Sequence, residues 1–114
     1  MTLDRTRERL SLAIEHLQNA ISYGRRGRAV FFNADVPDTQ RLVESELRKA
    51  FESLNRQGDS FYNANPTLDR ARVGVVRQML THDYAEIDPE VLWRLVTDEA
   101  PPLLRRLTRA RIPK

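Results

Sequence analysis

Residues 38–54 read DTQRLVESELRKAFESL, and the spacing of their apolar side chains decides the fold class. These side chains recur every three or four residues, which places them on one face of an α-helix. They are Val43, Leu47, Ala50, Phe51 and Leu54. Gly58 follows where a C-terminal cap belongs. The stretch therefore predicts an amphipathic helix that starts near Asp38 and is capped at Gly58.

The same periodicity predicts another helix before this one, with Gly24 as its natural stop. Its inward face consists of Leu3, Leu10, Ile14, Leu17 and Ile21. Residues 24–38, GRRGRAVFFNADVPD, contain two glycines and predict a loop, with Asp35 as a cap-like residue before Pro37. We expect the aromatic residues of this loop to pack into the core.

Two more helices are predicted after Gly58. The segment DSFYNA reads as a polar loop, and Asn65 with Pro66 as the start of a third helix. That helix buries Leu68, Val73, Val76 and Leu80. Asp88 and Pro89 open a fourth helix, and Pro101 with Pro102 predict a kink or a fresh helix start, since proline lacks a donor and clashes with the preceding turn. The sum is an all-α bundle of four or five helices in one domain, residues 1–114.

Composition excludes several kinds of chemistry. The chain has no cysteine and two histidines, so disulfides, thiolate ligands and cysteine nucleophiles are excluded and a zinc site is not expected. Neither a metal nor another cofactor is predicted. No apolar run is long enough to cross a bilayer, and the start MTLDRTRERL is too charged for a secretory signal. We therefore expect a cytoplasmic protein without a membrane contact.

The net charge of +3 is carried almost entirely by arginine, because lysine occurs only at Lys49 and Lys114. Arginine pairs with phosphates through two hydrogen bonds, which favours a polyanionic partner, although genome composition also enriches arginine. Two basic clusters could follow an RNA backbone or simply form solvated faces. They are Arg25, Arg26 and Arg28, and Arg105, Arg106, Arg109 and Arg111.

Residues 77–84, RQMLTHDY, contain the most chemically suggestive group: Arg77, His82 and Tyr84. Positions five apart on an unbroken helix differ by about 140°, so Arg77 and His82 would point away from each other. They meet only if the helix ends near Leu80 or if a second subunit supplies a partner. In a two-fold dimer the same patch faces itself, which would bring two copies of each group together.

The wider stretch, residues 77–104, resembles the HEPN-domain toxins of the HepT type. That family carries arginine, usually asparagine, three variable residues, histidine, one residue and tyrosine, followed by an acidic, hydrophobic helix with an aromatic residue and a late proline. Arg77, His82 and Tyr84 fill the motif here, and Ile87, Asp88, Val91, Trp93, Val96 and Pro101 match the helix. Gln78 replaces the asparagine, and Glu52 matches an acidic position often seen on the second long helix.

The resemblance implies a metal-independent ribonuclease that acts as a homodimer on RNA, in a HEPN-like bundle. Arg77 and His82 would be its catalytic residues, and Gln78 would support the site. His82 can move a proton near neutral pH, and Arg77 can stabilise charge on phosphorus. The partner in this family is commonly a small nucleotidyltransferase antitoxin of the MNT type. The motif tyrosine, here Tyr84, is the adenylyl acceptor, and a bulky anionic adduct there would block RNA.

Each of these residues also has a purely structural interpretation. His82 could cap the third helix, Arg77 could form a surface ion pair, and Tyr84 could be a packing residue. Trp93 is expected to pack in the bundle or at a dimer contact, and His16, on the polar side of the first helix, has no predicted role. The alternative function is a catalytically inactive HEPN module for dimerisation or RNA binding, and a third view is that the chain serves mainly as the substrate for adenylylation.

Overall fold

The computed structural model describes residues 2–81 and 87–113, and every regular element within them is helical. These elements are four long helical segments and two short helices, and a short helix follows each of the first two long segments. The long segments are α1 (Thr2–Gly24), α3 (Asp38–Asn55), α5 (Arg70–Thr81) and a continuous run of α6 (Pro89–Arg94), η1 (Leu95–Glu99) and α7 (Ala100–Thr108). The short helices are α2 (Arg28–Phe31) and α4 (Asp59–Ala64). The predicted all-α bundle is confirmed.

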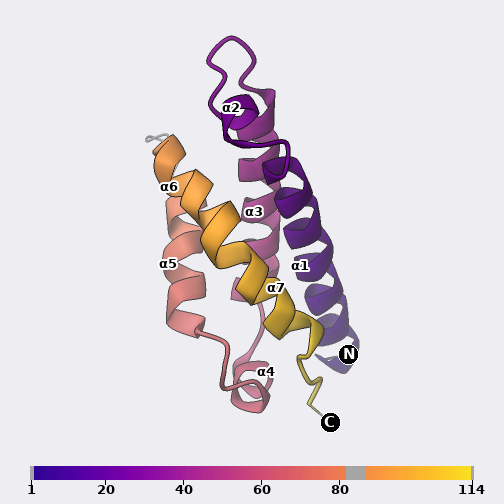
Figure 1. Cartoon of the computed structure of the whole chain (residues 1–114). Coiled ribbons are helices and arrows are strands. Elements are labelled where there is room, and N and C mark those ends of the chain that lie inside the picture. The colour runs from indigo at the N-terminus through magenta and orange to yellow at the C-terminus, as the bar shows by residue number, and fades with distance from the viewer. Residues whose placement is uncertain (1, 82–86, 114) are drawn as a thin grey trace.

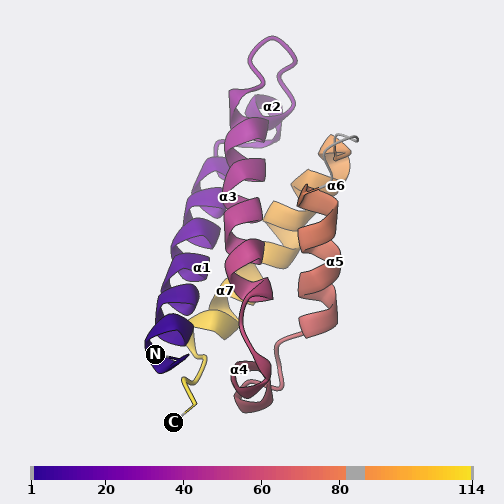
Figure 2. The same ribbon diagram turned by 180° about the vertical axis from the view of Figure 1, so that it is seen from behind.

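The bundle is built on the antiparallel pair of α1 and α3, which lie side by side over most of their length (Figure 1). Helix α5 packs on α3, and the run from α6 to α7 crosses the bundle obliquely and ends against α1 (Figures 1 and 2). α2 lies at one end of the molecule, and α4 lies at the other together with both termini. The fully buried core includes Leu17, Phe31, Val43, Leu47, Leu54, Phe61, Val76, Leu92, Val96 and Leu107.

Helix boundaries follow the sequence closely in α1 and α6. Helix α1 ends at Gly24, whose position leaves room for a Val96 methyl 3.3 Å from where a Cβ would stand. Asp88 caps α6 as predicted, because its Oδ1 accepts from the Glu90 N–H at 2.8 Å and Pro89 fills the first helical position.

The predicted start of the third helix at Asn65 and Pro66 is wrong. Helix α5 begins at Arg70, and Asp69 caps it by accepting from the Arg72 N–H at 3.0 Å. The Asn65 side chain instead bonds to the backbone of the C-terminal segment, as described below. Two capping residues stood near the same boundary, and the tertiary contacts of Asn65 decided between them.

Two predicted loops contain short helices. Residues 59–64 form α4, because Phe61 and Tyr62 bury their rings against the core while the polar residues of the segment face water. Gly58 is extended and precedes α4, so it is not a C-terminal cap. In the loop after Gly24, Arg28–Phe31 form α2, preceded by Gly27 at φ 102°, a conformation that favours glycine. Pro37, and not Asp35, occupies the N-cap position of α3.

A new helix starts at Pro101 and Pro102, as predicted, and a π-helical turn precedes it. Residues Leu95–Glu99 form one π-helical turn, and α7 begins at Ala100 with both prolines in its first turn. A proline cannot donate to the carbonyl four residues earlier and its ring presses against it, so the wider turn relieves the clash. None of the helices that the structure describes combines the length and apolarity needed to cross a bilayer.

Candidate active site

Arg77 lies on the last turns of α5 and is tied to α3. Its Nε donates to Oε1 of Glu52 at 3.2 Å, and both side chains are partly exposed, at 40% and 29%. Glu52 also lies 3.7 Å from a terminal nitrogen of Arg56. Arg77 therefore does form the ion pair that its structural interpretation predicted. The acidic position noted in the sequence, Glu52, is the partner that holds it.

The ion pair uses only one edge of the Arg77 guanidinium. Among the described residues neither of its terminal nitrogens makes a hydrogen bond or ion pair. A guanidinium carries five N–H donors in a planar fork, so most of this group's donors stay available to an anion. Glu52 thus fixes the orientation of Arg77 without using up its binding capacity.

Arg48, which was not predicted as a site residue, contacts the C-terminal end of α5. Its Nε donates to the Leu80 carbonyl at 3.0 Å, which satisfies one of the acceptors that a helix C-terminus leaves open. A terminal nitrogen of Arg48 lies 3.3 Å from Glu44. Glu44, Arg48 and Glu52 are spaced four residues apart on α3, and this spacing was the sequence signal that could have identified a charged face directed at α5.

The other predicted site residues differ in what the structure says of them. Gln78 is exposed and makes no hydrogen bond within residues 2–81 and 87–113. His82 and Tyr84 lie outside the described residues. The structure therefore positions Arg77 with its supporting ion pair, and His82 and Tyr84 stay predictions.

Trp93 packs inside the bundle, as predicted. Its ring centroid lies 5.0 Å from that of Phe31 and 6.1 Å from that of Phe32, and the two phenylalanines meet edge to face at 4.9 Å. The Arg28 guanidinium covers the Phe32 ring at 4.4 Å. We call Phe31, Phe32 and Trp93 the aromatic layer, which joins α2 to α6.

His16 lies on the polar side of α1, as expected, and there it faces α3. Its Nδ1 is 2.5 Å from Oε2 of Glu46 on α3, and Asn19 donates to the same oxygen at 3.4 Å. The side chains of His16 and Glu46 are only 19% and 14% exposed. The pair joins α1 to α3 and gives His16 a structural role.

The two basic clusters of the sequence have different surroundings. In the first, which we call the α2 cluster (Arg25, Arg26 and Arg28), Arg26 stacks over Tyr23 and donates to Thr39, and Arg28 pairs with Glu90. In the second, which we call the α7 cluster (Arg105, Arg106 and Arg109), all three side chains are exposed and line a common pocket. Within the described ranges, no group of three or more metal-ligating side chains is placed to hold an ion.

The sequence of the chain matches one known protein family over most of its length. Residues 11–110 match the family model described as ribonuclease HepT-like, which is most of the chain. The chain belongs to the HepT-like ribonuclease family. The resemblance drawn from residues 77–104 is thereby confirmed. A search of curated proteins and a search of solved structures found no match.

Membership of the HepT-like family accounts for the fold and gives the chemistry its class. The all-helical bundle is the expected HEPN-like architecture. The family name points to cleavage of RNA, and Arg77, the first residue of the motif, stands four residues before the end of α5, with no described partner for its terminal guanidinium nitrogens. A ribonuclease of the HepT-like family is the functional class that these observations support.

Proposed function

We propose that this chain is a metal-independent endoribonuclease toxin that cleaves RNA in the cytoplasm, with Arg77 and His82 as its catalytic residues. The observation that carries the proposal is the HepT-like family match together with the ion pair between Arg77 and Glu52. An arginine that must stabilise a transition state is most effective when its orientation is fixed before the substrate arrives. The contact with Glu52 supplies that fixation.

The chemistry needs only proton transfer and charge stabilisation, because RNA carries its own nucleophile. His82 would take the proton from the 2′-hydroxyl, whose oxygen then attacks phosphorus and forms a new P–O bond. The bond from phosphorus to the 5′-oxygen breaks, and that oxygen receives a proton from an imidazolium, either His82 after it has taken the first proton or its copy in the second subunit. Arg77 would donate to the nonbridging oxygens as their charge grows. The products are a 2′,3′-cyclic phosphate and a 5′-hydroxyl.

We place the active site at a two-fold dimer contact. Arg77 and His82 are five residues apart, so their side chains would diverge by about 140° on a regular helix. A second copy of the same patch offers each group a partner across the two-fold axis. The dimer would then be part of the mechanism, and dissociation would abolish cleavage.

Neutralisation would come from a nucleotidyltransferase antitoxin of the MNT type. The enzyme would transfer an adenylyl group from ATP to the Tyr84 hydroxyl, with release of pyrophosphate. The adduct adds a negative charge and a large group two residues from His82, so it would repel and exclude RNA.

Growth and cleavage assays test the ribonuclease proposal. Expression without a partner should slow growth, and the purified chain should cut RNA without added metal and in the presence of EDTA. Arg77→Ala and His82→Ala should each lower the cleavage rate about 100-fold or more. Arg7→Ala, which removes an exposed arginine that makes no contact with a described residue, is the matched control and should cleave at the wild-type rate.

Two further measurements test the finer parts. Sedimentation should give a dimer at assay concentrations, and a monomer with full activity would refute the shared site. Co-expression with a nucleotidyltransferase should add the mass of an adenylyl group to wild-type protein and none to Tyr84→Phe.

Gln78 favours one alternative, an inactive HEPN module. It replaces the usual asparagine and is exposed, and its side chain makes no hydrogen bond to the residues that the structure describes. The comparison of wild type with Gln78→Asn separates the two functions. An inactive wild type that gains cleavage with Gln78→Asn would identify a module that has lost activity, and equal cleavage by both would exclude it.

A further inference from the structure

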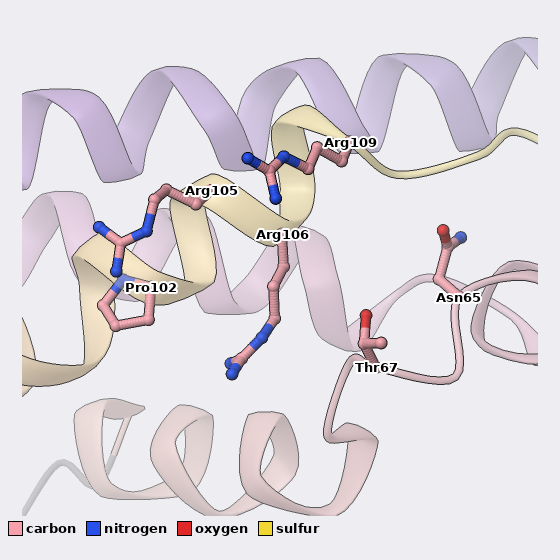
Figure 3. A pocket seen from close by; sticks show the side chains of 6 residues that line it. All are labelled: Asn65, Thr67, Pro102, Arg105, Arg106 and Arg109. Carbon is pink, nitrogen blue, oxygen red and sulfur yellow. The ribbon is translucent and has the colours of Figure 1, made fainter.

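A pocket of about 420 Å³ lies between the end of α7 and the turn that precedes α5. Its lining residues are Asn65, Thr67, Pro102, Arg105, Arg106 and Arg109, and none of them is acidic. Figure 3 shows Arg106 extending from α7 towards α5, while Asn65 and Thr67 approach from the other wall. The pocket is open to solvent on one side, with a size typical of ligand sites.

The three arginines of the α7 cluster share this pocket without a partner. No hydrogen bond, ion pair or ring contact joins their guanidinium groups to any residue that the structure describes. Six other arginines of the chain each form an ion pair with a carboxylate: Arg28, Arg48, Arg56, Arg70, Arg72 and Arg77. All three carry the same charge and repel one another, and a bound anion would reduce that repulsion.

Asn65 fixes the two walls of the pocket relative to each other. Its Oδ1 accepts from the Arg111 N–H at 2.8 Å, and its Nδ2 donates to the Arg111 carbonyl at 2.9 Å and to the Phe61 carbonyl at 2.8 Å. These bonds hold the segment after α7 against the turn before α5. These bonds join the two walls at Asn65, so the backbone around the pocket is held in place without a ligand.

We propose that this pocket binds a phosphate group, carried either by an RNA chain or by a free nucleotide. Guanidinium forks bind phosphate oxygens through paired, charge-assisted hydrogen bonds, and the long, exposed side chains of the α7 cluster can turn towards a phosphate held in the pocket. The Thr67 hydroxyl adds a neutral donor on the opposite wall. The site goes beyond the ribonuclease proposal and does not depend on it.

The pocket is a discrete site and not part of a basic track that leads to Arg77. Arg77 lies seven positions after Arg70, the first residue of α5, and is thus about 10 Å along the helix axis from the end that the pocket adjoins, so one phosphate cannot contact both regions. A neighbouring pocket of about 270 Å³ shares Pro102 and Arg106 but contains three carboxylates, Asp69, Asp98 and Glu99. These acidic groups interrupt the positive surface on the α5 side.

The helix dipole offers a simpler explanation of the cluster. Basic side chains in a last turn stabilise the helix through its dipole, and this effect needs no ligand. It does not explain why the three arginines line one pocket with no acidic residue in its walls. The two explanations differ in a measurable way, because only the binding site loses affinity for phosphates when the cluster is removed.

Binding measurements on the whole chain test the proposal with two probes: a labelled single-stranded DNA decamer, which lacks the 2′-hydroxyl and is not cleaved, and ATP. The variant is Arg105→Ala with Arg109→Ala, and the control with the same loss of charge is Arg5→Ala with Arg7→Ala, two exposed arginines without described partners. The pocket variant should bind its ligand at least about tenfold more weakly, and the control within about twofold.

The salt dependence and the choice of probe complete the test. For the decamer, the loss of two phosphate contacts should reduce the slope of log affinity against log salt by about 1.4. Loss confined to the decamer identifies a nucleic-acid backbone as the ligand, and loss of saturable ATP binding identifies a nucleotide. Equal effects in variant and control, or no binding of either probe by wild type, would overturn the proposal. A ribonuclease assay on the same samples reports separately on Arg77 and His82.

Discussion

The α2 cluster and the α7 cluster have the same number of arginines, yet only the first is built into the fold. Arg26 and Arg28 stack on aromatic rings and bond to Thr39 and Glu90. The arginines of the α7 cluster meet no such partner among the described residues. The comparison teaches that a basic run has no fixed meaning, because the acceptors and rings that the fold brings to it decide its role.

The largest expected effect is on the aromatic layer that supports the α2 cluster. Phe31 is fully buried against Phe32 and Trp93, so Phe31→Ala should lower the free energy of unfolding by about 3–5 kcal/mol. Urea titration followed by the fluorescence of Trp93, the only tryptophan, measures the change. Val30→Ala is the control, because Val30 is 44% exposed and should change stability by less than about 0.5 kcal/mol. Equal effects of the two variants would contradict the described packing.

A second effect, of about 2 kcal/mol, concerns Tyr62, a buried tyrosine whose ring lies against the Arg70 guanidinium. Burial raises the pKa of Tyr62 to about 12, and the Arg70 guanidinium 4.9 Å from its ring lowers it by less. The unfolded tyrosine ionises near pH 10, so the unfolded state loses its proton first and stability falls as pH rises from 10 to 12. The full contribution is present below pH 10.

Tyr62→Phe isolates this titration. The variant loses the bond from the Tyr62 hydroxyl to the Leu54 carbonyl, 2.6 Å long, which should cost about 1 kcal/mol at pH 8. Its stability should then decrease less than that of wild type between pH 10 and 12. Parallel curves for the two proteins would show that Tyr62 keeps its ordinary pKa.

The third prediction separates the clusters directly. The pair between Arg28 and Glu90 is half exposed, so Arg28→Ala should cost about 1 kcal/mol or less, and part of that is loss of contact with the Phe32 ring. Urea titrations at low and high salt measure it, and the difference between variant and wild type should shrink with salt. A difference that stays constant with salt would assign the effect to the ring contact alone.

The smallest effect is expected in the α7 cluster. Arg105→Ala with Arg109→Ala should leave stability within about 0.5 kcal/mol of wild type, since no described contact is lost. Thermal unfolding followed by circular dichroism measures it. A loss above about 1 kcal/mol would place these arginines in the fold and make the two clusters alike.

Helix existence was predictable because apolar periodicity is a local signal. The faces of α1, α3 and α6 read directly from the sequence, and Asp88 and Pro89 marked a boundary that needs no distant partner. The start of α5 was not predictable in the same way. Asn65 and Asp69 are both good capping residues, and the choice depends on Arg111, which lies 46 residues from Asn65 and becomes its neighbour only in the folded chain.

The candidate site residues were likewise predictable from local sequence signals, whereas their contacts with distant parts of the chain were not. The motif gave Arg77 and the acidic position Glu52, but not the hydrogen bond between them, which depends on how α5 packs on α3. Arg48 was missed because its contact is with a backbone carbonyl, and any residue type at Leu80 would offer the same acceptor. The α4 helix was missed because its two buried aromatic residues are adjacent and show no helical repeat.

The two prolines after the π-helical turn, Pro101 and Pro102, set the direction of helix α7. Helix α7 has nine residues and is therefore about 13 Å long, so a change of 10° in its direction at Ala100 would move its far end by about 2 Å. That displacement is comparable to the difference between a hydrogen bond and none. A change in the direction of α7 on replacement of Pro101 and Pro102 would thus move the guanidinium groups of the α7 cluster together, relative to Thr67 on the opposite wall of the pocket.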